Sequence, residues 1–304
     1  ELATPGGGEL LGHDPHWVIL RTLYISESGI TTAGSLASRS VAPPIPGPLR
    51  VLSITTAPLD RSATSIEEEE SAFLKVLNVI PPTTEILFAE SGTFDELDDL
   101  VDQFEPHVVH FSGMASMDRA GRGLLAFEDD LGQIQFRSIE DLVATTLRGS
   151  SVRCLVLNLV DRSRIHGAAV GMSLLEAGGP PCLVLDRPLR DGDSLEVLTH
   201  WYNAVAKGRT LAEAMLGHRA EQARNPRAQR PNLSSNHASL YAKSDVHVIH
   251  PERAQENPTR SIVSRRVLPW GLIELRRGMV GARRLIQQSL GTLRLGNPPL
   301  LILT

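Results

Sequence analysis

His107-Val108-Val109-His110-Phe111-Ser112 and Val152-Arg153-Cys154-Leu155-Val156-Leu157-Asn158 are the two stretches that decide the fold of this 304-residue chain. Both are short, mostly apolar and bounded by turn-forming or charged residues, which is the pattern of buried strands. The sequence between and around them has helix-start signals of the capping-box type, such as Thr93-Phe94-Asp95-Glu96. Alternating strands and helices predict an α/β fold with a mainly parallel sheet, helices on both of its faces and right-handed crossovers.

The remaining elements follow the same alternation. The predicted strands and helices are Leu49–Thr55, Ser65–Val79, Glu85–Ala89, Thr93–Phe104, Leu124–Glu128 with Gln133–Phe136 as a hairpin, Ser138–Gly149, Gly167–Ala177, Cys182–Asp186, Asp193–Gly208, Thr210–Arg224, Ser239–Tyr241 and Val246–Ile249. Residues 1–24 predict an additional N-terminal β-hairpin. The acidic run Glu67–Glu70 suits a helix N-terminus because of the helix dipole, and we expect it to form a solvated face.

Composition excludes several classes of protein. The formal charge of −5 predicts no nucleic-acid footprint, and the chain has no apolar run near the roughly 18–20 residues that span a bilayer. We therefore expect a cytoplasmic protein without membrane or nucleic-acid partners. Its two cysteines, Cys154 and Cys182, fall inside apolar strands and have no second ligand at short spacing, which predicts reduced core residues and no metal site. No cofactor is expected.

Open parallel sheets bind ligands beyond the carboxyl ends of their strands. Met114 and Val160 follow the two central strands directly, so their side chains are expected to face one crevice. Five further residues near the strand ends are candidates for lining that crevice: Ser112, Gly113, Asn158, Asp161 and Asp186. The two aspartates are candidates for holding a basic side chain of a peptide, although exposed loop carboxylates without a specific role are a simpler interpretation.

The ordered set of segments resembles the CHAT family, caspase-like domains of the caspase and separase clan. It includes His110-Phe111-Ser112-Gly113-Met114-Ala115, Leu155–Val160, the small-residue helix Gly167–Gly178, and Trp201–Met215 with its Leu-Ala-Glu-Ala sequence. In that family the first strand runs into Ser-Gly-His-Gly and the second into Asn-Ala-Cys, and the His and Cys form the proteolytic dyad. Here Met114 stands in place of the His and Val160 in place of the Cys, so no catalytic residue is predicted. A thiolate and an imidazole are what a cysteine peptidase needs.

Composition also predicts the domain organisation. Residues 1–48 are predicted to be a hairpin and linker packed on the core, 49–250 the caspase-like domain, and 251–277 a linker. Residues 278–304 resemble the lead-in to a STAND-type P-loop ATPase, with Gly278–Arg284, a helix over Leu285–Leu295 and a strand over Pro299–Thr304. The resemblance implies a pseudo-protease that acts as a protein-interaction or regulatory module of a signalling protein. Its partner would be another protein or its own C-terminal ATPase region.

Two alternatives remain open. The first is an active cysteine endopeptidase with a relocated dyad, in which Cys154 or Cys182 reaches His110; the position of Cys154 in mid-strand disfavours it. We interpret His110 as structural. The second alternative is a doubly wound domain that binds a small molecule at the switch in strand order. The loop Ala57-Pro58-Leu59-Asp60 offers no glycine to cradle a phosphate, which speaks against a nucleotide.

Overall fold

The computed structural model describes residues 20–21, 44–58, 66–77, 84–159, 164–185, 192–224 and 238–250. The elements are β1 (Leu20–Arg21), β2 (Arg50–Thr55), α1 (Ile66–Leu77), β3 (Glu85–Phe88), α2 (Phe94–Phe104), β4 (Val108–Gly113), β5 (Ala115–Met117), β6 (Gly123–Glu128), β7 (Ile134–Ser138), α3 (Ile139–Leu142), the π-helical turn η3 (Val143–Leu147), β8 (Cys154–Leu159), α4 (Arg164–Glu176), β9 (Cys182–Leu185), α5 (Gly192–Ala206), α6 (Leu211–Arg224) and β10 (Ala238–Tyr241).

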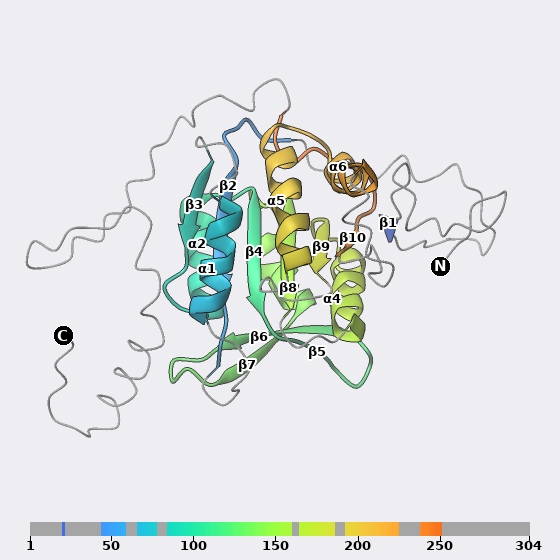
Figure 1. The fold of residues 1–304 in the computed structure, drawn as a ribbon. Coiled ribbons are helices and arrows are strands. Elements are labelled where there is room, and N and C mark those ends of the chain that lie inside the picture. The colour runs from blue at the N-terminus through green and yellow to red at the C-terminus, as the bar shows by residue number, and fades with distance from the viewer. Residues whose placement is uncertain are drawn as a thin grey trace, which may run out of the picture.

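Seven strands form the main sheet, in the order β1-β10-β9-β8-β4-β2-β3 (Figure 1). Strands β3, β2, β4, β8 and β9 are parallel, β10 is antiparallel to β9, and β1 is parallel to β10. The predicted α/β class with a mainly parallel sheet is confirmed. Of the hairpin predicted for residues 1–24, only Leu20–Arg21 is described; the rest lies outside the described residues.

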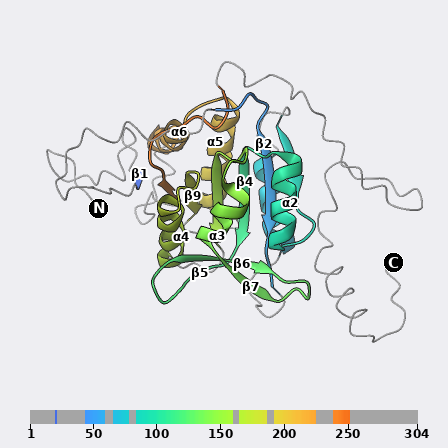
Figure 2. The ribbon, with the colours of Figure 1, turned by 180° about the vertical axis from the view of Figure 1, so that it is seen from behind.

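Helices cover both faces of the main sheet, as predicted. One face carries α1, α5 and α6, and the other carries α2, α3 and α4, as the front and back views show (Figures 1 and 2). The alternation of side chains along β8 explains why both faces are apolar: Cys154 and Val156 join the first core, while Leu155 and Leu157 join the second. Trp201 and Tyr202 of α5 are fully buried in the first core.

A second, three-stranded antiparallel sheet lies beyond the carboxyl end of β4, in the order β5-β6-β7. The hairpin of β6 and β7 was predicted, but β5 was not, because three residues give too short a pattern. A close approach of β6 to α4 helps to fix the position of this small sheet. A Cβ atom at Gly123 would lie 2.4 Å from the Cα atom of Val170, so only glycine fits there.

Three local predictions need correction. Val246–Ile249 forms isolated bridges to Ile45 and Thr210 instead of a strand. The helix predicted from Ser138 is α3 followed by η3, so its second half is π-helical. The capping box at Thr93 is only half formed: the Thr93 hydroxyl accepts from Glu96 N, while the Glu96 carboxylate accepts from the backbone N–H groups of Glu90 and Ser91.

Candidate functional site at the carboxyl edge of the central strands

The order of strands reverses between β2 and β4. From β2 the chain moves outward to β3, and it then crosses back over β2 to β4 and continues to β8 and β9. The carboxyl ends of β2 and β4 therefore flank a topological switch point, where open parallel sheets place their ligand sites. The small sheet lies at this same end of the molecule (Figure 1). The predicted crevice residues belong to or follow strands that end at this edge.

Ser112 and Asn158 are direct neighbours across β4 and β8. Asn158 Nδ2 donates to Ser112 Oγ at 3.0 Å and to Glu69 Oε2 of α1 at 2.7 Å. Asn158 is fully buried and Ser112 nearly so. Among the described residues, Asn158 Oδ1 has no hydrogen-bond partner. The structure thus brings two predicted crevice residues together, and a third side chain from a helix joins them.

Glu69 is the residue that the sequence interpretation missed. The expectation of a solvated face for Glu67–Glu70 is wrong for two of its members, because Glu69 is 3% and Glu70 is 5% exposed. The signal was present in the spacing, since Glu69, Ala72, Phe73 and Val76 lie on one face of α1 and the last three are core residues. The burial of Glu69 was missed because four consecutive glutamates suggest a helix end that is exposed to solvent on every side.

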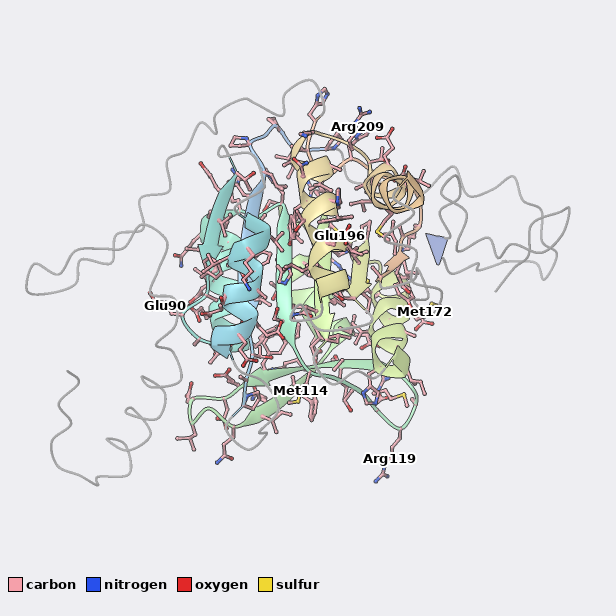
Figure 3. All side chains as sticks on the ribbon, in the orientation of Figure 1. Glu90, Met114, Arg119, Met172, Glu196 and Arg209 are labelled. Atoms are coloured by element: carbon pink, nitrogen blue, oxygen red, sulfur yellow. The ribbon has the colours of Figure 1, made fainter. Side chains whose placement is uncertain are left out.

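Gly113 and Met114 carry the chain from the main sheet into the small sheet. A Cβ atom at Gly113 would approach the Phe111 ring to 2.8 Å and would also collide with Thr56 Oγ1, so the residue has to be glycine. Met114 is half-buried, and its carbonyl accepts from Ala126 N at 3.0 Å; Figure 3 shows its place at the junction with the small sheet. Val160, Asp161 and Asp186 lie outside the described residues, so the position of the second dyad counterpart is not tested.

A buried carboxylate joins the small sheet to the end of β2. Glu128, at the end of β6, is 2% exposed, and its Oε1 accepts from Ala57 N at 2.8 Å. Thr56 N in turn donates to the Ser112 carbonyl at 2.8 Å. Thr56 Oγ1, in contrast, is buried and lacks a hydrogen-bond partner among the described residues. Hydrogen bonds of Ser112, Asn158, Glu69 and Glu128 thus link the strands and α1 at this edge, and two buried polar atoms, Asn158 Oδ1 and Thr56 Oγ1, have no partner in the described part of the chain.

Neither cysteine of the chain reaches this edge as a thiolate. Cys154 lies at the start of β8, and Cys182 at the start of β9; both are fully buried. Burial raises the pKa of both thiols far above the ordinary value, so both stay protonated at neutral pH. The relocated dyad requires an exposed, activated thiol, and these two positions do not provide one.

His110 is a core residue, in agreement with the structural interpretation. Its Nδ1 lies 3.0 Å from the Tyr202 hydroxyl, and its ring stacks on Phe73 with centroids 4.1 Å apart. Burial lowers the pKa of His110 to about 3, because the protein interior disfavours the imidazolium. The imidazole is neutral at pH 7 and is enclosed between the sheet, α1 and α5.

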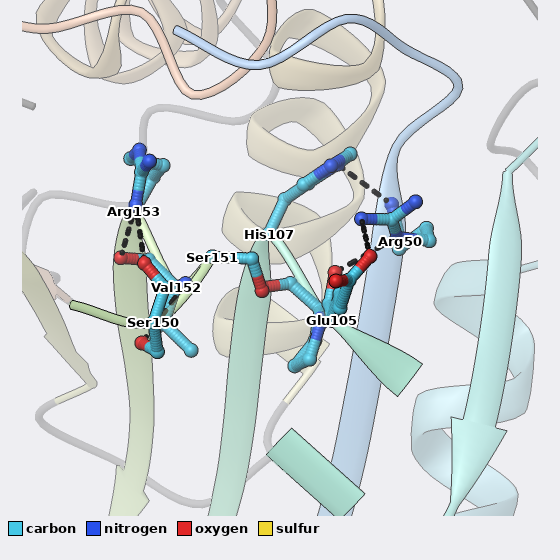
Figure 4. Close-up of polar contacts among 8 residues, drawn as sticks. Arg50, Glu105, His107, Ser150, Ser151, Val152 and Arg153 are labelled. Atoms are coloured by element: carbon cyan, nitrogen blue, oxygen red, sulfur yellow. Dashed lines mark hydrogen bonds and ion pairs between the residues drawn. The ribbon is translucent and has the colours of Figure 1, made fainter. Parts of the chain in front are cut away.

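A second polar cluster lies at the opposite, amino-terminal edge of the sheet (Figure 4). The backbone N–H of Arg50 donates to His107 Nδ1 at 3.2 Å, and Arg50 Nε donates to the Glu105 carbonyl at 2.8 Å. Arg153 donates to the carbonyls of Ser150 and Val152. Burial, together with the positive charges of Arg50 and Arg153, lowers the pKa of His107 to about 3. These contacts satisfy polar groups at the starts of β2, β4 and β8, and we interpret them as structural.

Among the described residues, no group of three or more His, Cys, Asp or Glu side chains is arranged to hold a metal ion. No helix in the described ranges is long and apolar enough to cross a bilayer. A scan against protein-family models gives no match, and a search of curated proteins finds no significant relative. The chemistry of the site therefore has to be argued from its own residues. The described ones offer an amide, a hydroxyl and buried carboxylates, and among them no nucleophile is paired with a base.

Proposed function

We propose that this chain is a catalytically inactive, caspase-like domain of the CHAT type that works by binding protein partners within a cytoplasmic multidomain signalling protein. The observation that carries the proposal is the state of the carboxyl edge of β4 and β8. The Asn158 amide ties the Ser112 hydroxyl to the Glu69 carboxylate there, and both cysteines of the chain are buried away from it. The mainly parallel architecture is consistent with a caspase-like fold.

The physical reason is the lack of a nucleophile. Cysteine proteolysis requires a thiolate that is accessible to a peptide carbonyl and within reach of an imidazole. The His110 imidazole is hydrogen-bonded to the Tyr202 hydroxyl. The half-buried Met114 offers only a thioether sulfur, which is a weak hydrogen-bond acceptor. Ser112 Oγ accepts from the Asn158 amide, and the described residues place no base beside this hydroxyl that would activate it.

Thiol reactivity of the native protein tests this proposal. The protein is titrated with a small alkylating reagent near neutral pH, and the label is located by mass spectrometry. We expect Cys154 and Cys182 to react only after unfolding, because both are inaccessible. Rapid labelling of either cysteine, with a rate that titrates well below the free-thiol pKa of about 8.5, would demonstrate an activated thiolate and overturn the proposal.

A gain-of-function variant tests the alignment behind the proposal. Met114→His with Val160→Cys is expected to place an imidazole and a thiol in one crevice and to create a fast-labelling cysteine at position 160. Val160→Cys alone is the matched control and should label more slowly, with a pKa near that of a free thiol. Equal rates and equal pH profiles for the two variants would show that positions 114 and 160 do not face each other.

A second candidate function is the binding of a small polar molecule at the same edge. It is favoured by Asn158 Oδ1 and Thr56 Oγ1, which are buried at the switch point and lack partners among the described residues. A ligand with N–H or O–H donors would satisfy both atoms. An increase of the melting temperature in a screen of polar metabolites, abolished by Thr56→Val, would favour this function over the interaction module.

A further inference from the structure

We propose that residues 261–268 of this chain add to the main sheet as an extra strand along the open edge of β3. The inference does not depend on whether the carboxyl edge is catalytic. It starts from the main chain of β3, which in the described part of the protein has a hydrogen-bonded neighbour on one side only, namely β2. Figure 1 shows β3 at the outer side of the sheet.

The hydrogen bonds between β2 and β3 show which groups of β3 face outward. Glu85 N donates to the Leu49 carbonyl at 2.9 Å, and Ala89 N donates to the Ser53 carbonyl at 2.8 Å. In a parallel ladder alternate residues point their N–H and C=O groups to the same neighbour, so Leu87 also faces β2. Ile86 and Phe88 therefore direct four main-chain groups away from the sheet.

In the described ranges of the chain, this edge carries only part of the usual protection against strand addition. Natural edge strands are kept very short or are shielded by charged side chains, proline, a bulge or a covering segment. β3 has the sequence Glu-Ile-Leu-Phe, without lysine or proline, and its register with β2 is regular over all four residues. The Phe88 side chain is 6% exposed and packs in the core, whereas the other three residues of β3 are half-buried. Among the described residues nothing pairs with the outer main-chain groups of β3, which leaves this edge available to an added strand.

The surroundings of the edge are acidic. Residues 85–105, which include β3 and α2, contain eight Asp and Glu residues and no Lys or Arg. Residues 251–304 contain nine arginines and three glutamates, without Lys or Asp, which is a formal charge of +6. Because the whole chain carries −5, residues 1–250 carry −11. The C-terminal segment therefore matches this side of the domain in charge.

Within that segment, residues 261–268 combine strand-forming residues with positive charge. Their sequence is Ser-Ile-Val-Ser-Arg-Arg-Val-Leu, followed by Pro269, and it is rich in the β-branched residues that strands favour. Successive residues of a strand point to opposite faces, so Arg265 and Arg266 would lie on opposite faces of the extended sheet. Those faces carry α1 and α2, which present acidic side chains such as Glu68 and Asp99. Two adjacent arginines thus match two acidic helices.

The chain leaves the domain at a suitable point. His250 N donates to the Ile45 carbonyl at 2.7 Å, and Ile45 precedes β2 by five residues. The start of β2 is also the start of β3 in space, because Arg50 pairs with Glu85. The twelve residues from His250 to Ile262 can span up to about 40 Å, which is enough to reach any part of β3. The geometry therefore permits residues 261–268 to pair within the same molecule.

Residue-resolved amide hydrogen exchange on the 304-residue chain tests the proposal. We expect the Ile86 and Phe88 amides to exchange about 100-fold more slowly than unstructured amides, as docked strands do. Ser264→Pro removes a donor from the added strand and should speed the exchange of Ile86 and Phe88 by about 10-fold or more. The Leu87 amide, which is bonded to β2, should be unchanged. Ser289→Pro, the same substitution elsewhere in the segment, should have no effect.

Charge reversal provides an independent measurement. Arg265→Glu with Arg266→Glu should speed exchange at Ile86 and Phe88, while Arg283→Glu with Arg284→Glu, the matched control, should not. Fast exchange of Ile86 and Phe88 in the unmodified chain would show that nothing covers the edge and would overturn the proposal. Slow exchange that survives Ser264→Pro would also overturn it, and a dependence on protein concentration would then identify a second copy as the occupant.

Discussion

The buried imidazole of His110 makes the stability of the fold dependent on pH. The side chain is 0% exposed, and burial lowers its pKa from 6.5 to about 3. As the pH falls, the unfolded chain binds a proton at this position first, whereas the folded protein stays neutral. The stabilisation is therefore fully present above pH 6.5, and it is lost progressively down to the folded pKa of about 3.

The size of the effect follows from the shift. One pKa unit corresponds to about 1.4 kcal/mol, so His110 lowers the free energy of unfolding by about 1.4 kcal/mol per pH unit in this window. Over the whole window the loss is on the order of 5 kcal/mol, which is a large part of a typical domain's stability. His110→Gln can still bond to the Tyr202 hydroxyl and does not titrate. We expect the variant to be less stable at pH 7 but to lose less stability in acid.

Urea denaturation followed by tryptophan fluorescence at pH 7, 6, 5 and 4 measures this difference. Between pH 6 and 4 the slope of unfolding free energy against pH should be shallower in His110→Gln by about 1.4 kcal/mol per pH unit. His200→Gln, at a partly buried position of α5, is the control for the chemical change. Equal slopes in the His110→Gln variant and the unmodified protein would refute the assignment of His110 as a neutral core residue.

Two further predictions concern the carboxyl edge. Asn158→Asp puts a second carboxylate beside Glu69 and removes the donor that now binds Glu69 at 2.7 Å. The variant should therefore be less stable by about 3 kcal/mol at pH 7 and by less at pH 5. An equal loss of stability at both pH values in urea denaturation would contradict the buried contact. Gly113→Ala should lower the free energy of unfolding by about 1–3 kcal/mol, because the added Cβ collides with Phe111. The control Gly217→Ala lies on α6 with nothing within 4 Å of its Cβ, and it should raise the free energy of unfolding by about 0.5–1 kcal/mol. A thermal melt in which both variants shift alike would count against this account.

The sequence alone was sufficient to predict those strands and helices whose signal lies within a few neighbouring residues. Strands β4 and β8 were recognisable as apolar runs, and the boxes at Ser138 and Thr210 mark helix starts that the structure contains. At Thr210 the capping box is complete, because the backbone N–H of Thr210 also donates to the Glu213 carboxylate at 3.1 Å. Such signals can be read in a sequence because both partners lie within four residues of each other.

The site itself depended on contacts that span the chain. The sequence by itself was sufficient to predict the α/β class and the burial of both cysteines. Only the tertiary structure decided that Asn158 meets Glu69, 89 residues away, and that Ser112 lies opposite Asn158. The order of strands in the sheet sets these distances, and a sequence pattern specifies which face a residue occupies without specifying which strand lies next to it.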